Sequence, residues 1–145
     1  MSLAAKLRRA PLRLATGAFI LNSGLGKVSA DEGTAQFLHG AGAGAYPVLK
    51  KVDPTVFAKV LAFTEIGVGA ALLLPIVPAG LAGLALVGLS GALVGIYIRT
   101  PALHDKYLRP SQDGTAFAKD IWLLGTGVAL VVDAALSESP ITATE

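Results

Sequence analysis

The sequence predicts an all-α membrane protein, an antiparallel four-helix transmembrane bundle, and two observations carry that prediction. Hydrophobic residues make up 53% of the 145 residues and charged residues only 15%, whereas soluble domains carry about 25% charged residues. In addition, no charged residue occurs from Ile66 to Ile98. Because a helix needs roughly 20 residues to cross a bilayer core of about 30 Å, this stretch is too long for one span and fits two.

The first predicted span covers about residues 11–30. Arg13 and Lys27 stand near its two ends, where their side chains can reach opposite membrane interfaces. A second interpretation is that residues 1–30 form a cleaved signal peptide. Basic residues precede a short apolar run there, and Val28-Ser29-Ala30 resembles a signal-peptidase site.

The second and third predicted spans cover about residues 57–77 and 79–98. Pro75 and Pro78 interrupt the helical hydrogen bonds between them. A turn this short predicts that the two helices pack against each other as an antiparallel hairpin. The fourth predicted span covers about residues 117–136, with Lys119 and Trp122 near the membrane interface. All four spans belong to one predicted membrane domain, residues 1–145.

The two long connections lie on the same side of the predicted bundle, because a short turn joins the second and third spans. The first connection contains the glycine–alanine segment His39–Pro47, which we expect to be a flexible or interfacial loop. It lacks the Gly-Lys-Ser/Thr ending of a phosphate-binding loop. The orientation of the bundle in the membrane stays open. Most basic residues lie in the connections, which favours an N-terminus outside the cell, whereas the basic residues that flank the first span favour an N-terminus inside it.

The residue inventory excludes several kinds of chemistry. The chain has no cysteine, and its one methionine is Met1. His39 and His104 fall in the predicted connections, so no pair of residues suited to ligating a membrane haem, an iron–sulfur cluster or another metal is present. The basic residues are scattered, which gives no concentrated footprint for nucleic acid. We therefore expect no covalently bound or metal-ligated cofactor.

An intramembrane polar layer is the candidate binding site. Glu65 lies about two turns into the second span, and an ionised glutamate facing lipid at that depth costs at least ~2 kcal/mol, so it should face the bundle and have partners. The other spans offer polar groups at nearly the same depth, and Lys27 lies one turn from Ser23. The predicted layer is Asn22, Ser23, Lys27, Glu65, Ser90 and Thr126. It forms either a pocket for a head group or proton, or a layer that only holds the helices together.

Small residues and one ion pair are predicted to pack the helices. Close backbone approach stabilises helix pairs in lipid, and the predicted contact positions are Gly67 and Gly69, then Gly88, Gly91 and Gly95, then Gly125 with Ala129. Arg13 and Asp133 lie at matching depth in the first and fourth spans. We expect these two side chains to form a structural ion pair.

Two segments resemble the DoxX family of small bacterial membrane proteins. The first span contains Arg13, Gly17, Phe19 and then Ser-Gly-Leu-Gly-Lys at 23–27, and the second contains Glu65, small residues and a leucine run that ends at Pro75. The resemblance covers roughly residues 12–136, although the long glycine–alanine segment departs from the family pattern.

The DoxX family is named after a small subunit of a terminal quinol oxidase that is also linked to thiosulfate:quinone oxidoreduction. The resemblance therefore implies a multi-pass protein of the bacterial inner membrane. It also implies an accessory subunit of a quinone-linked oxidoreductase complex, with quinone as a ligand but no redox centre of its own. Two other functions stay open: a non-catalytic membrane scaffold or assembly protein, and a small transporter or proton conduit built around Glu65.

Overall fold

The computed structural model describes residues 3–138, and this part of the chain is helical, with one isolated bridge between His104 and Pro110 and no strand. The all-α prediction is confirmed. The long helices are α1 (Leu3–Val28), α3 (Pro54–Leu73), α4 (Ala79–Arg99) and α6 (Asp120–Glu138); the connections contain α2 (Glu32–Ala45), η1 (Pro47–Lys51), η2 (Pro101–Leu103) and α5 (Thr115–Ala118).

Three helical segments are long and apolar enough to cross a membrane, namely Pro54–Leu73, Ala79–Arg99 and Thr115–Ser137. They indicate a multi-pass membrane protein. The first predicted span, residues 11–30, is different: α1 begins eight residues earlier and carries Lys6, Arg8, Arg9 and Arg13 in its first half. It does not qualify by the same length and composition.

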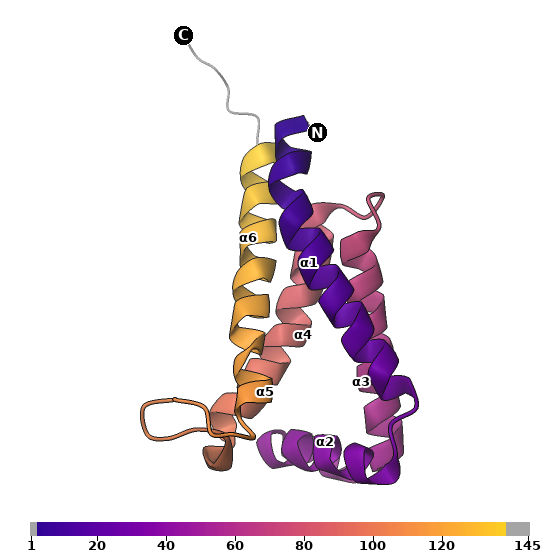
Figure 1. Cartoon of the computed structure of the whole chain (residues 1–145), viewed down its shortest axis with the longest axis vertical. Coiled ribbons are helices and arrows are strands. Elements are labelled where there is room, and N and C mark those ends of the chain that lie inside the picture. Colours follow the sequence, from indigo (N-terminus) through magenta and orange to yellow (C-terminus); the bar gives the residue numbers. More distant parts are fainter. Residues whose placement is uncertain (1–2, 139–145) are drawn as a thin grey trace.

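The long helices pack as two pairs, α1 against α3 and α4 against α6. Figure 1 shows the pairs close together near the start of α1 and the end of α6 and separated at the opposite end, where α2 lies across the opening. The predicted α3–α4 hairpin is therefore wrong in its packing. The turn after Leu73 joins these helices, but they contact each other far less than they contact α1 and α6.

Glycines explain why these pairs form. A methyl group added at Gly69 of α3 would lie 2.6 Å from the backbone nitrogen of Leu21 in α1, and one added at Gly24 would lie 2.7 Å from the carbonyl oxygen of Ala62. In the second pair, one added at Gly83 would lie 2.9 Å from the carbonyl oxygen of Gly127. The helix backbones can approach this closely only because no side chain intervenes.

Most of the glycines predicted to pack the helices do not lie where two long helices approach each other. A methyl group added at Gly67, Gly88, Gly91 or Gly125 would have no neighbouring atom within 4 Å in the described residues. Gly95 contacts Tyr46, at the end of α2, rather than another long helix. Only Gly69 among the predicted positions lies in a close helix pair, because the sequence pattern does not reveal which side of an apolar helix its partner covers.

The glycine–alanine segment is helical, so the predicted loop at His39–Pro47 is also wrong. Asp31 caps α2, its carboxylate accepting a hydrogen bond from the Thr34 backbone N–H at 2.7 Å. Alanine has the highest helix propensity, and several alanines alternate with the glycines. Gly42 faces Phe57 of α3, where an added methyl group would lie 2.9 Å from the ring. The helix is thus capped at its start and packed against α3.

Candidate functional site

A buried carboxylate and a lysine join the first helix pair. The ammonium nitrogen of Lys27 lies 2.8 Å from Oε2 of Glu65, whose side chain is only 5% exposed. The same nitrogen donates to the hydroxyl oxygen of Ser23 at 2.7 Å and to its carbonyl oxygen at 3.3 Å. An ammonium group has three donors, so Ser23 and Glu65 hold Lys27 in one position. Three members of the predicted polar layer, Ser23, Lys27 and Glu65, are therefore brought together.

A second buried carboxylate, Asp120, lies in the other helix pair and was not among the predicted site residues. It is the first residue of α6, its side chain is 3% exposed, and Oδ1 lies 3.4 Å from the ammonium nitrogen of Lys119. A helix N-terminus stabilises a negative charge. One signal could have revealed this residue: a carboxylate directly after Lys119, inside the fourth predicted span, requires a partner just as Glu65 does.

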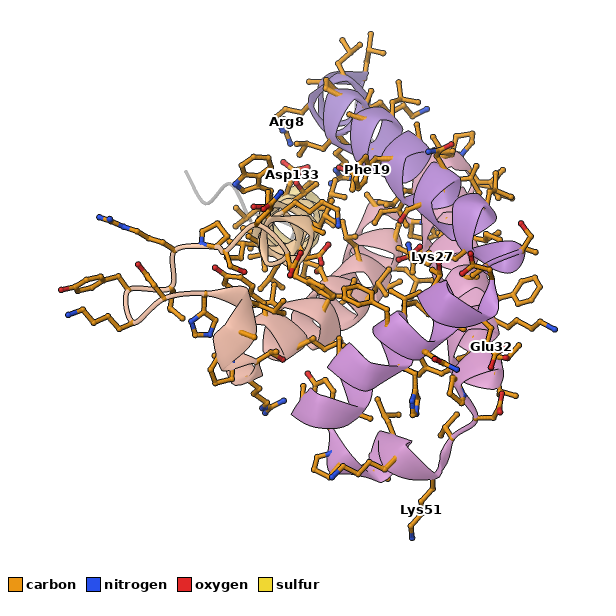
Figure 2. The ribbon with its side chains drawn as sticks, turned by 60° about the horizontal axis from the view of Figure 1, so that its bottom comes forward. Arg8, Phe19, Lys27, Glu32, Lys51 and Asp133 are labelled. Carbon is orange, nitrogen blue, oxygen red and sulfur yellow. The ribbon has the colours of Figure 1, made fainter. Side chains whose placement is uncertain are left out.

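The two carboxylates line one cavity of about 150 Å³ between the helix pairs. Lys27 and Lys119 stand at its wall, and the charges of Glu65 and Lys27 act on Asp120. The rest of the lining is apolar and comes from α2, α3, α4 and α5: Phe37, Leu38, Phe57, Leu61, Leu93, Ile96, Ala116 and Phe117. Helix α2 lies across this end of the molecule, and Figure 2 shows Lys27 between α1 and α2.

The hydrogen-bonding groups of the cavity are not saturated. Within residues 3–138, Glu65 accepts a hydrogen bond only through Oε2, and Asp120 side-chain bonding involves only Oδ1. The remaining oxygen of each carboxylate is able to accept a proton or a hydrogen bond. The cavity therefore combines two acceptors and two cations with mainly apolar walls, and mainly apolar walls with a few placed polar groups are typical of small-molecule sites.

The other members of the predicted polar layer do not line this cavity. Asn22 is exposed on the outer side of α1. Ser90 is buried, but its hydroxyl donates to the carbonyl oxygen of Leu86 in its own helix at 2.6 Å. Thr126 is half-buried in α6. Depth along the helix placed these residues at the same level, but the rotation of each helix directs them to different surroundings.

The predicted ion pair between Arg13 and Asp133 is wrong in its basic partner. Asp133 instead accepts from Arg8 at 2.8 Å and from Arg9 at 2.5 Å. Arg13 turns to α3 and donates to the carbonyl oxygens of Ala71, Leu72, Leu74 and Val77, at distances of 2.7–3.0 Å. The last carbonyl oxygens of a helix have no intrahelical donor, so those at the end of α3 are available to accept hydrogen bonds from Arg13.

The part of the chain that the structure describes shows no candidate metal site. No group of three or more His, Cys, Asp or Glu side chains there could hold an ion. Nε2 of His39 lies 2.9 Å from the carbonyl oxygen of Leu49, and both ring nitrogens of His104 lie within 3.2 Å of backbone carbonyl oxygens. Both histidines therefore hold connecting segments in place.

Comparison with known proteins assigns this chain to no group. No protein-family model matches it, and no match was found among curated proteins or among solved structures.

Proposed function

We propose that this protein is a DoxX-like, four-span bundle of the bacterial inner membrane that binds a quinone head group between Glu65 and Asp120. In this proposal it is an accessory subunit of a quinone-linked oxidoreductase, and electron transfer belongs to a partner subunit. The observation that carries the proposal is the cavity itself, which combines apolar walls with two carboxylates and two lysines.

The size of the cavity suits a single ring. An apolar protein cavity of about 150 Å³ holds one benzene molecule, and the cavity here has that volume. Phe37, Phe57 and Phe117 supply aromatic walls for such a ring.

The polar groups suit both oxidation states of a quinone. Quinone carbonyl oxygens accept hydrogen bonds from ammonium groups, and Lys119 has a donor for one, because its ammonium group makes two of three possible hydrogen bonds within the described residues. Quinol hydroxyl groups donate to carboxylates, and Glu65 and Asp120 each have an oxygen with acceptor capacity. One cavity can therefore hold either form without any redox group of its own.

Binding of a short-chain ubiquinone to the purified protein tests the proposal. Trp122 is the single tryptophan of the chain and lies two residues after Asp120, so quenching of its fluorescence reports binding. We expect saturable binding that Glu65→Gln and Asp120→Asn each weaken about tenfold, the loss of about 1.4 kcal/mol of binding free energy. Asp113→Asn is the matched control, because Asp113 is an exposed carboxylate in the connection before α5. Quenching that does not saturate, or that is the same in every variant, would contradict the proposal.

A non-catalytic scaffold is the second candidate function. It is favoured by the internal pairing of Lys27, whose ammonium group already makes three hydrogen bonds within the protein. Copurification separates the two functions. If the protein is a scaffold, protein partners copurify with it without quinone, and Glu65→Gln does not change their recovery. If it is a quinone-binding subunit, the purified protein retains extractable quinone, and Glu65→Gln loses it.

A further inference from the structure

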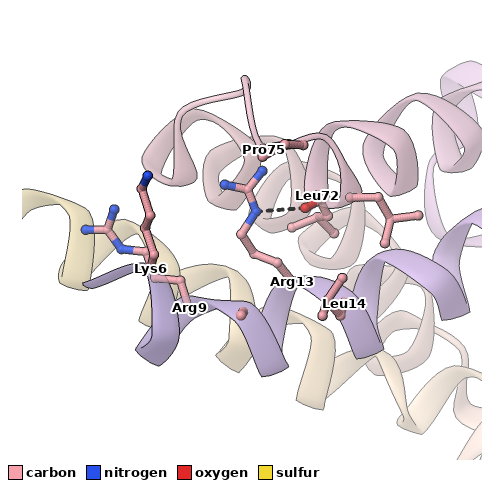
Figure 3. Close-up of a pocket in the computed structure, with 8 residues that line it drawn as sticks. Lys6, Arg9, Arg13, Leu14, Leu72 and Pro75 are labelled. Carbon is pink, nitrogen blue, oxygen red and sulfur yellow. Dashed lines mark hydrogen bonds between the residues drawn. The ribbon is translucent and has the colours of Figure 1, made fainter. Parts of the chain in front are cut away.

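A groove of about 260 Å³ lies at the other end of the molecule, between the first half of α1 and the end of α3. Its polar lining consists of Lys6, Arg9 and Arg13, and its apolar lining includes Leu14, Leu73 and Pro75. Figure 3 shows Lys6 and Arg13 projecting from the same side of α1 towards the segment that joins α3 to α4. Because α3 ends at Leu73 and α4 begins at Ala79, the groove lies at the edge of the candidate membrane spans.

The positive charge of this groove is only partly neutralised. Asp133 at this end of the molecule is shared by two arginines, Arg8 and Arg9. Arg13 donates to neutral carbonyl oxygens, which fix its guanidinium group but leave its charge uncompensated. Lys6 is exposed and forms no ion pair with a described side chain. Two cations therefore face the groove without an anionic partner.

An apolar stripe runs next to the cationic side of α1. Leu3, Leu7 and Leu14 are spaced by four and seven residues, which places them on one helix face, and each is more than half exposed. Lys6 and Arg13 are also seven residues apart and share a neighbouring face. A molecule that lies along this part of α1 thus meets cations on one side and apolar side chains on the other.

We propose that this groove binds an anionic phospholipid, with the phosphate group between Lys6 and Arg13 and an acyl chain along Leu14 and Leu73. Basic pockets at the ends of membrane helices bind anionic head groups in this manner. The position at the edge of the spans and the uncompensated charge together favour a lipid over a soluble anion. This site is independent of the quinone cavity, which lies at the α2 end.

The proposal is tested by counting lipids bound to the full chain with native mass spectrometry. Phosphatidylglycerol and phosphatidylcholine with identical acyl chains are the two probes, and we expect phosphatidylglycerol to bind about tenfold more tightly. Lys6→Glu should abolish this preference, and Lys6→Gln should reduce it by at least threefold. Lys51→Glu is the matched control, because Lys51 is exposed at the opposite end of the molecule, where Figure 2 shows it pointing away from the helices.

The other outcomes overturn the proposal. Equal binding of the two lipids, or equal losses in Lys6→Glu and Lys51→Glu, would show that binding follows overall charge and not the groove. Competition by millimolar inorganic phosphate or glycerol phosphate as strong as that by the lipid would show a site for soluble anions. Thermal unfolding in a zwitterionic detergent shows whether each variant is folded. If Lys6→Glu does not fold, Lys6→Gln still tests the proposal.

Discussion

The ammonium nitrogen of Lys27, at the end of α1, lies 2.8 Å from Oε2 of Glu65, in the middle of α3. Removing the lysine leaves a buried carboxylate without its cation, and breaking a fully buried pair costs about 3–5 kcal/mol. Because the Lys27 side chain is 21% exposed, we expect Lys27→Gln to reduce the free energy of unfolding by about 2 kcal/mol. Thermal unfolding in detergent measures this loss.

A second substitution distinguishes the charge from the packing. Glu65→Gln added to Lys27→Gln removes the stranded charge and should restore most of the lost stability. Lys59→Gln is the control, since Lys59 is exposed on the same helix as Glu65. If the double variant is no more stable than Lys27→Gln alone, the ion pair does not explain the loss.

Arg13 is expected to stabilise the end of α3. Its guanidinium group satisfies four backbone carbonyl oxygens around the turn, and a hydrogen bond from a charged donor contributes about 1.5–3 kcal/mol. We expect Arg13→Met to cost about 2 kcal/mol or more and Arg13→Lys to be intermediate, since an ammonium group cannot span the four acceptors. Lys6→Met, which removes an unpaired lysine, should change unfolding in zwitterionic detergent little. Equal stability of Arg13→Met and Lys6→Met would refute this role.

Two glycines of α3 provide a matched test of helix pairing. An alanine at Gly69 would place its methyl group 2.6 Å from the backbone of Leu21, whereas one at Gly67 meets no described atom within 4 Å. Overpacking costs about 1–3 kcal/mol, so Gly69→Ala should lower the unfolding temperature. Gly67→Ala should leave it unchanged or raise it, because alanine is the better helix former by up to about 1 kcal/mol. The same result for both variants would contradict the close α1–α3 contact.

Cysteine labelling tests the membrane topology, and the natural chain contains no cysteine to interfere. Ile76, in the turn between α3 and α4, is 84% exposed, and Gly44 and Gln112 are exposed in the two long connections. We expect Ile76→Cys to react with a membrane-impermeant maleimide from one side of the bilayer, and Gly44→Cys and Gln112→Cys from the other. Reaction of Ile76→Cys and Gly44→Cys from one side would rule out the antiparallel arrangement.

The cap of α2 makes its stability depend on pH. Hydrogen bonds from Thr34 hold the pKa of the Asp31 carboxyl below its ordinary value, which is about 3.9. The ionised cap therefore stabilises α2 fully above that ordinary pKa, and this contribution is lost as the pH falls through the lowered value. We expect hydrogen-exchange protection factors in α2 to fall in acid for the natural chain, but to stay constant in Asp31→Asn, whose amide caps without titrating. An equal fall in both would exclude this cap as the cause.

The turn between the second and third predicted spans could be predicted from the sequence, but the rotation of each helix about its axis could not. Pro75 and Pro78 mark the turn, and the cost of an unpaired glutamate in lipid predicted partners for Glu65 in a polar layer that included Lys27. The faces of α4 gave no comparable signal, because this helix carries no charged residue before Arg99. Nothing in its pattern shows that Gly83 has a packing partner and Gly88 does not.

Two further features depend on contacts between segments far apart in the chain. Helix α2 was missed because its glycines favour a loop locally, whereas packing of Gly42 against Phe57 favours a helix. Asp133 was correctly expected to pair with α1, but several arginines on that helix lie within reach of one carboxylate. Arg13 instead binds backbone carbonyl oxygens at the end of α3 and in the turn that follows it. A sequence pattern does not show which backbone carbonyl oxygens are available as acceptors.

The division into two helix pairs affects the order in which the protein can assemble. The contacts that join α1 to α3 and its following turn, including Arg13 with Val77 and Lys27 with Glu65, all lie before Pro78 in the chain. Domains generally fold as units, N-terminal first, during synthesis, so α1 and α3 can insert and join before the ribosome has made α4. The cavity around Asp120 and the bonds from Arg8 and Arg9 to Asp133 form only when the later pair docks. The candidate cavity, which is lined by residues of α5 and α6 as well as of α1 and α3, therefore closes only after the second pair has been made.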